Sequence, residues 1–208
     1  MSKIDYLEEL GAEDGSKFLI IAELRPKWML LLLLLRKHVR LSVKTTMKML
    51  GMSYSQLKRA IRYLSGVPDE KATRPFISTT RVKPLIYVEM ISYNEKYLML
   101  TEYGKEFVDK VLRFLKKISI MYGRAEPEEL GISKVEFEAT VRKKLVEIGV
   151  KDVEPYVSRV IDLRKLTRNL ALVQPILLRI LDPIVLGYIP VEIETASKTR
   201  VILYAVPP

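Results

Sequence analysis

The side chains best suited to chemistry lie on one predicted helix, residues 54–64. Outside its apolar stripe, this helix carries hydrogen-bonding and cationic side chains: Ser55, Gln56, Lys58, Arg59, Arg62 and Tyr63. An arginine can pair with two acceptors on guanine, and a glutamine can pair with adenine in a similar two-bonded way. Gln56 and Arg59 lie in the N-terminal half of the helix, the half that reaches base edges when a helix enters the major groove. These two residues are therefore our candidates for reading bases.

A second group of side chains is suited to contacts with phosphate. It comprises Lys44, Thr45, Lys48, Arg62 and Tyr63, and the segment 67–84 adds Lys71, Arg74, Arg81 and Lys83. Phosphate contacts supply affinity and position but carry no sequence preference. We expect Arg74 and Arg81 to extend a phosphate-binding surface beyond the helices.

The net charge of the chain is concentrated around these residues. The stretch from Leu24 to Pro68 holds ten Lys and Arg and no Asp or Glu, whereas the rest of the chain holds 25 of each kind. An ordinary solvated helix face mixes charges of both signs. The segregation of positive charge therefore favours a nucleic-acid-binding face over a merely solvated one.

Three helices would hold these residues in place. The first begins at Pro26, which suits the first turn of a helix, and runs to about Val39 as an apolar, buried element. Ser42 is a suitable N-cap for the second helix, which ends at Gly51 because glycine accepts the left-handed conformation of the turn. Ser53 caps the third helix. Apolar residues mark the core sides of the second and third helices: Val43, Met47, Leu50, Leu57, Ile61 and Leu64.

A β-hairpin and a further helix follow. Residues 85–91 and 97–100 are rich in β-branched and aromatic residues, which predicts two strands around a turn at 92–96. A helix over 102–120 comes next. The order over residues 26–120 is therefore helix, helix, turn, helix, hairpin, helix.

This order resembles the winged helix-turn-helix domain of archaeal and bacterial transcription regulators. The exit of the hairpin, Tyr97-Leu-Met-Leu-Thr-Glu-Tyr-Gly104, is similar to the LT-x-x-G signature that MarR- and PadR-type regulators carry. The resemblance implies double-stranded DNA as the partner and residues 54–64 as the recognition helix. The segment 67–84 is longer than its counterpart in that family, and the turn at 92–96 is shorter.

The C-terminal part predicts helices and a terminal hairpin. After a polar linker over 123–131, Ser133 and Glu136 form a capping box that starts a helix ending near Gly149. A second helix is predicted over 153–173. Further along the chain we expect a helical segment broken by prolines at 175–186, and a hairpin formed by 189–194 and 200–206.

The predicted fold class is α+β, mainly α with a small antiparallel β-hairpin: a winged helix-turn-helix followed by a helical C-terminal region that ends in a β-hairpin. We expect three parts. These are an acidic N-terminal segment (1–24), the winged helix-turn-helix domain (25–122) and a helical and hairpin domain for dimerisation or partner binding (123–208).

Enzymatic chemistry finds little support in the sequence. The chain has no cysteine and a single histidine, His38, so a thiolate metal site is excluded and a histidine-based site would rest on one residue. No glycine-rich phosphate loop or nucleophile motif occurs. We therefore predict no catalytic residue, no cofactor and no metal.

The sequence also gives no sign of membrane targeting. The first ten residues are acidic and amphipathic, unlike a signal peptide, and the apolar run Trp28–Leu35 is too short to span a bilayer. We expect a cytoplasmic protein. Its many Lys, Arg and Glu residues and few Asn and Gln resemble the composition of a hyperthermophile's protein.

Two functions remain open at this stage. The first is an archaeal, double-stranded-DNA-binding transcription regulator, acting as a homodimer through the helix 102–120 and the C-terminal region. The second is an interaction or architectural module of a replication, transcription or chromosome-organisation complex, with non-specific nucleic-acid binding. A third reading makes the C-terminal region a degenerate second winged helix, in a tandem reader or adaptor.

Overall fold

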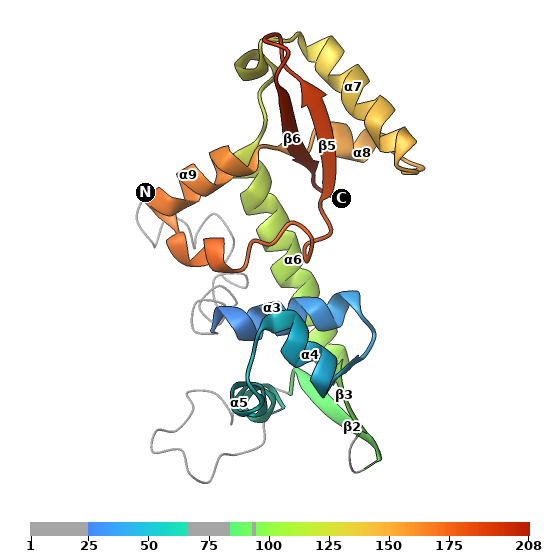
Figure 1. Cartoon of the computed structure of the whole chain (residues 1–208), viewed down its shortest axis with the longest axis vertical. Coiled ribbons are helices and arrows are strands. Elements are labelled where there is room, and N and C mark those ends of the chain that lie inside the picture. Colours follow the sequence, from blue (N-terminus) through green and yellow to red (C-terminus); the bar gives the residue numbers. More distant parts are fainter. Residues whose placement is uncertain (1–24, 66–83, 93–94) are drawn as a thin grey trace. The chain divides into compact units, whose positions relative to one another are not determined.

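The computed structural model describes residues 25–65, 84–92 and 95–208, and the described chain is mixed α+β (Figure 1). It contains two small antiparallel sheets of three strands each. The chain divides into two compact units, which we call unit 1 (Met1–Leu112) and unit 2 (Arg113–Pro208). The division falls inside a long helix, α6 (Glu102–Gly123), whereas the sequence pointed to the linker that follows this helix.

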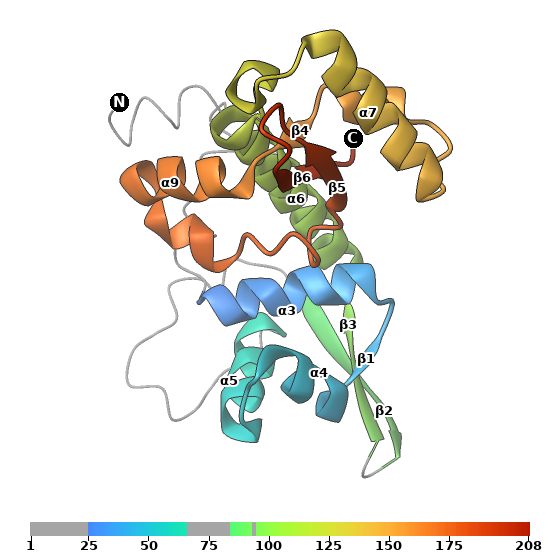
Figure 2. The ribbon, with the colours of Figure 1, turned by 45° about the horizontal axis from the view of Figure 1, so that its top comes forward.

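The described part of unit 1 begins with a helix, a very short strand and two more helices. Its elements are α3 (Pro26–Lys37), β1 (Leu41–Ser42), α4 (Val43–Leu50), α5 (Tyr54–Leu64), β2 (Ile86–Ser92), β3 (Glu95–Leu100) and the start of α6. The sheet order is β1-β3-β2, so the two-residue strand β1 pairs with the second strand of the hairpin. Figure 2 shows α3 beside α4 and the hairpin, in keeping with their contacts.

The caps predicted for α4 and α5 are confirmed. The Ser42 hydroxyl accepts a hydrogen bond from the Thr45 amide at 3.1 Å, and Gly51 adopts the left-handed conformation with φ of 56°. The Ser53 hydroxyl accepts from the Gln56 amide. These caps satisfy amides that a helix N-terminus otherwise leaves without partners, and so they fix where both helices start.

The core faces of these helices differ slightly from the prediction. In α5, Leu57, Ala60 and Leu64 are buried. In α4 the buried residue is Thr46. Its hydroxyl donates a hydrogen bond to the Ser42 carbonyl at 2.9 Å, so its polar group is satisfied in the core. The apolar residues predicted for this face of α4 are half-buried.

The LT-x-x-G segment joins the end of β3 to the start of α6 and packs against the residues before β2. The Thr101 hydroxyl donates to the Pro84 carbonyl at 2.6 Å and accepts from the Gly104 amide at 2.9 Å. A Cβ on Gly104 would overlap the Leu85 carbonyl oxygen, which itself accepts from the Thr101 amide at 3.0 Å. Glycine is therefore required here by the close approach of two backbone segments.

Unit 2 packs helices against its own small sheet. After the end of α6 it contains η1 (Pro127–Leu130), α7 (Lys134–Glu147), α8 (Glu154–Val157), β4 (Val160–Ile161), α9 (Leu163–Val173), η2 (Pro175–Arg179), β5 (Ile189–Glu194) and β6 (Arg200–Ala205). Phe137, Val141 and Leu145 on α7 form a core with Val191 of β5 and Leu203 of β6. The sheet order is β4-β6-β5 (Figure 2), and the predicted terminal hairpin is confirmed.

The single helix predicted over 153–173 is wrong. The structure has α8, the strand β4 and α9 in its place. The β-branched residues Val160 and Ile161 are buried and pair with β6, opposite Ala205 and Tyr204. Asp162 then caps α9 by accepting from the Arg164 amide. Strand pairing by these β-branched residues therefore divides the segment, and this cap starts a new helix.

The two units share a chain order and a strand order. In each, a two-residue strand leads directly into a capped helix (α4 or α9), a second helical element follows (the helix α5 or the short η2), and a hairpin comes next. In each, the two-residue strand pairs with the last strand of the hairpin.

Within the described ranges, no helix is both long and apolar enough to cross a membrane.

Candidate nucleic-acid interface

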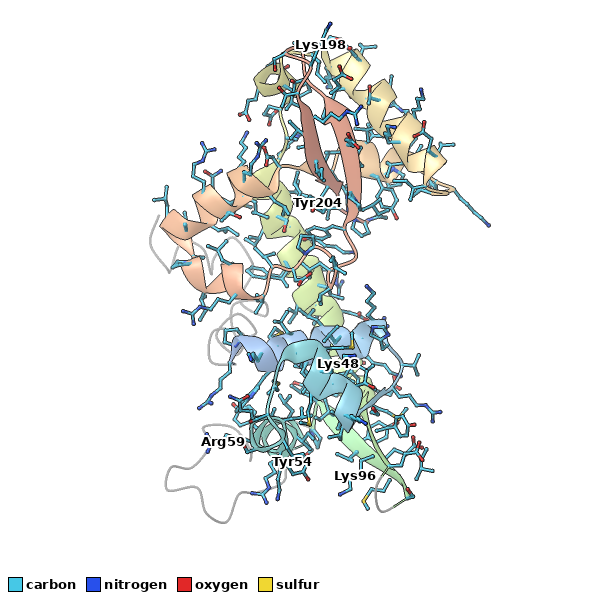
Figure 3. The ribbon with its side chains drawn as sticks, viewed as in Figure 1. Lys48, Tyr54, Arg59, Lys96, Lys198 and Tyr204 are labelled. Carbon is cyan, nitrogen blue, oxygen red and sulfur yellow. The ribbon has the colours of Figure 1, made fainter. Side chains whose placement is uncertain are left out.

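The exposed side of α4 and α5 carries most of the predicted site residues. Lys44 and Lys48 lie one turn apart on α4, and Lys58 and Arg59 lie on α5; all four are exposed. Figure 3 shows Lys48, Tyr54 and Arg59 projecting from these two helices. We call Lys44, Lys48, Lys58 and Arg59 the basic face.

The cations that flank the basic face are held by other groups. Lys27 donates to the Gly51 carbonyl at 2.8 Å, and the Arg25 guanidinium lies 5.3 Å from the centre of the Trp28 ring. Arg36 makes a two-bonded ion pair with Asp109, at 2.7 and 3.2 Å. Its hydrogen bond to Asp109 raises the pKa of the Arg36 guanidinium above the ordinary value. These cations therefore stabilise unit 1.

Arg40 is likewise engaged. Its guanidinium lies 3.8 Å from a carboxylate oxygen of Glu89 and 4.8 Å from the centre of the Tyr97 ring. By contrast, none of the four residues of the basic face forms an ion pair with a residue that the structure describes.

Gln56 has a local structural role that the sequence reading did not give it. Its side-chain oxygen accepts a hydrogen bond from the Ser53 amide at 3.0 Å, which completes a capping box with Ser53. Pairing with adenine needs both the oxygen and the nitrogen of the amide. Gln56 would therefore have to break this cap to read a base in that way, and Arg59 becomes the stronger candidate for base contact.

The remaining predicted site residues differ in their surroundings. Ser55 is exposed and shares a hydrogen bond with the Ser53 hydroxyl at 3.0 Å, and the Thr45 hydroxyl accepts from the Ser42 hydroxyl at 2.8 Å. Arg62 is exposed near the end of α5. The half-buried ring of Tyr63 packs on Trp28 with 4.7 Å between ring centres.

Arg74 and Arg81 lie outside the described residues, as do Lys71 and Lys83. Their predicted contacts with phosphate remain predictions.

A groove runs beside the basic face, where the starts of α4 and α5 meet β3. It is lined by Ser42, Val43, Lys44, Tyr54, Glu95, Lys96 and Tyr97. Lys44 and Lys96 bring positive charge to it, and the start of α4 adds the partial positive charge of a helix N-terminus. The sequence reading missed Tyr54 and Lys96. Tyr54 could have been found from its position one turn before Lys58, whereas Lys96 required the pairing of the hairpin strands.

The hairpin itself carries negative charge close to the groove. Glu95 accepts a hydrogen bond from the Tyr97 hydroxyl at 2.6 Å, and this bond raises the pKa of Tyr97. Glu89 lies opposite Tyr97 on the neighbouring strand. Two carboxylates on a short hairpin oppose its entry into a DNA groove, because the phosphates repel them.

The described residues contain no group of three or more His, Cys, Asp or Glu side chains that could hold a metal ion. His38 is half-buried just after α3. Comparisons of the chain with protein-family models, curated proteins and solved structures found no match.

Proposed function

We propose that unit 1 is a winged helix-turn-helix domain that binds double-stranded DNA. Two features support this proposal. The order helix, helix, helix, hairpin, helix agrees with the order on which the resemblance rests, and β1 pairs with the hairpin in the sheet order β1-β3-β2. The α4–α5 pair then presents one exposed, positively charged side, as a helix-turn-helix does.

The observation that carries the proposal is the partition of the cations. Those around α3 are engaged within unit 1, such as Arg36 with Asp109, whereas the basic face forms no ion pair with a described residue. These four cations have no ion-pair partner among the described residues, so they repel one another across two adjacent short helices, and a polyanion would relieve that repulsion. A DNA backbone provides such a partner.

In the proposed complex, α5 lies in the major groove and α4 crosses the backbone. Arg59 contacts base edges, Lys58 flanks it, and Lys44 and Lys48 contact phosphates. Lys96 and Tyr54 line the groove beside Lys44 and contact the same strand. The carboxylates of the hairpin stay outside the minor groove.

The decisive experiment separates the charge of Arg59 from its planar geometry. DNA fragments are first selected from a random duplex pool by the intact protein, and binding is then measured by fluorescence anisotropy. Arg59→Ala should weaken binding to the selected duplex by about 1–3 kcal/mol. Arg59→Lys should keep affinity for random duplex but lose discrimination, because lysine cannot form the two-bonded pair with guanine.

Arg124→Ala is the matched control, because Arg124 is an exposed arginine of unit 2. It should leave DNA affinity unchanged. An Arg59→Ala variant that is folded and binds the selected duplex as tightly as the parent protein would contradict the proposed recognition helix.

We further propose that the protein is a transcription regulator that acts as a homodimer. Two-fold symmetry suits operators with two half-sites, and α6 or unit 2 would supply the contact between copies. Light scattering after size-exclusion chromatography tests this point directly. A monomer at micromolar concentration, alone and with DNA, would remove the homodimer from the proposal.

One observation favours the second candidate function, a module with non-specific nucleic-acid binding. Gln56 is committed to the capping box, so the exposed part of α5 offers fewer side chains for base readout than its sequence suggested. Sequencing of the selected fragments distinguishes the two functions. An enriched motif supports the regulator, and a pool without one supports the architectural module.

A further inference from the structure

Unit 2 presents an apolar patch where α9 meets η2. Leu172 is 84% exposed, Val173 42% and Ile176 38%. These residues lie within five positions of the chain, across the junction of two elements that pack together. A single exposed leucine is common, whereas large apolar side chains that group on one surface are characteristic of interaction sites.

Positive charge flanks the α9–η2 patch. Residues 163–181 contain four Lys and Arg and no Asp or Glu. Arg164 pairs with Asp162 and Lys165 with Glu129. Arg168 and Arg179 are exposed, one before and one after the patch along the chain, and neither forms an ion pair with a residue in the described ranges. A segment that covers the patch should therefore be both apolar and acidic.

The shared chain order of the two units gives this patch a place in the fold. The α9–η2 junction has the same place in the element order of unit 2 as the α4–α5 junction has in that of unit 1. In unit 1 the exposed side of that helix pair is cationic and polar. In unit 2 it is apolar with two flanking arginines, which suits a polypeptide partner better than a DNA backbone.

One segment of this chain has the matching chemistry. Residues 1–24 carry six Asp and Glu against two Lys. Ile4, Leu7 and Leu10 recur at every third position, a spacing suited to one side of a helix, with Glu8 and Glu9 between them. These residues lie outside the described part of the chain.

We propose that the α9–η2 patch binds the acidic segment 1–24 of this protein. Leu172, Val173 and Ile176 would cover the apolar residues of the segment, and Arg168 and Arg179 would face its carboxylates. Apolar contact would supply most of the affinity, and the opposite charges would supply orientation. The proposal does not depend on DNA binding by unit 1.

The absence of cysteine in the chain allows a direct test in the full-length protein. The pair Ala12→Cys with Ala171→Cys places one thiol in the segment and one beside the patch. The control pair, Ala12→Cys with Ser197→Cys, uses another exposed position of unit 2. Under mild oxidation the first pair should form its disulfide at least about tenfold faster, because docking raises the effective concentration of the thiols.

Two further variants in the first cysteine pair test the chemistry of the contact. Leu172→Asp with Ile176→Asp should slow cross-linking by about tenfold, since it removes the apolar anchors. Arg168→Glu with Arg179→Glu should slow cross-linking mainly at low salt. The matched control is Val135→Asp with Val146→Asp, which changes two exposed valines of α7 and should leave the rate unchanged. Circular dichroism confirms that each variant is folded.

Equal cross-linking rates for the two cysteine pairs would overturn the proposal, as would rates that neither patch variant changes. The mass of the cross-linked product shows which copy supplies the segment, and a product of one chain or of two supports the proposal equally. Failure here would leave the DNA-binding test of unit 1 unaffected.

Discussion

At the scale of single residues, the structure distinguishes two polar side chains that the sequence predicts to have the same role. Gln56 and Arg59 are three positions apart on α5 and share the same sequence argument for base contact. The Gln56 oxygen is used by the Ser53 amide, whereas the Arg59 guanidinium has no partner in the described chain. A local cap thus separates two residues that composition and spacing treat alike.

Substitution of Gln56 tests this separation. Gln56→Ala should lower the free energy of unfolding by about 0.5–2 kcal/mol, because it removes one half of the capping box. Gln56→Glu keeps an acceptor for the Ser53 amide and should retain most of that stability. Chemical denaturation measures both. A loss of sequence preference in Gln56→Ala without a loss of stability would return Gln56 to base readout.

A buried tyrosine should lower the stability of unit 2 as the pH rises into the alkaline range. Tyr188 is 5% exposed and its hydroxyl donates to Ser119 at 2.8 Å. Burial raises the pKa of Tyr188 from 10.0 to about 12. The unfolded chain therefore ionises this tyrosine first as the pH rises, so its contribution is complete below about pH 10 and is lost towards pH 12.

We expect the free energy of unfolding to fall over this range by up to about 3 kcal/mol from this residue. The relevant quantity is the difference in the free energy of unfolding between the parent protein and Tyr188→Phe, because this difference isolates the contribution of Tyr188. That difference should shrink between pH 10 and 12. A difference that stays constant over this range would show that the pKa of Tyr188 is not raised in the folded state.

At the scale of elements, the start of α6 makes a close backbone contact with Leu85, the residue before β2. Gly104 allows it, because a side chain at this position would overlap the Leu85 carbonyl. Thr101 completes the joint with bonds to Pro84 and Gly104. The resemblance to a family signature at these positions thus has a local physical basis in packing and hydrogen bonding.

Gly104→Ala should therefore destabilise the protein by about 1–3 kcal/mol or more through overpacking. Glu106→Ala, at an exposed position of the same helix, is the control and should stay within about 0.5 kcal/mol of the parent. Thermal unfolding compares the two. If both variants melt at the temperature of the parent protein, the joint between α6 and Leu85 is looser than described.

Local signals allowed most elements to be predicted. The serine caps of α4, α5 and α7, the left-handed glycine after α4 and both hairpins follow from residues within a few positions of each other. The helix predicted over 153–173 failed, because Val160 and Ile161 pair with a strand that lies more than forty positions further along the chain. No local pattern contains that partner.

At the scale of the whole molecule, the proposed DNA contact predicts a salt dependence. The two lysines proposed to contact phosphate, Lys44 and Lys48, should together contribute about −2 to the slope of log K against log salt. Lys44→Ala with Lys48→Ala should flatten this slope by about 2. Lys143→Ala with Lys151→Ala removes the same charge from exposed positions of unit 2 and should leave the slope unchanged. Equal slopes for the two variants would assign the binding to overall charge and not to the basic face.

The sequence by itself determined the features that depend on neighbours along the chain. These are the segregation of positive charge between Leu24 and Pro68, the helix boundaries and the hairpins. Tertiary structure alone decided which of those cations form ion pairs with described carboxylates. Arg36 meets Asp109 across 73 positions and Arg40 meets Glu89, while Lys44, Lys48, Lys58 and Arg59 meet no described carboxylate. The physical reason is that an ion pair depends on distance in space, and folding brings together carboxylates and guanidinium groups that lie far apart along the chain.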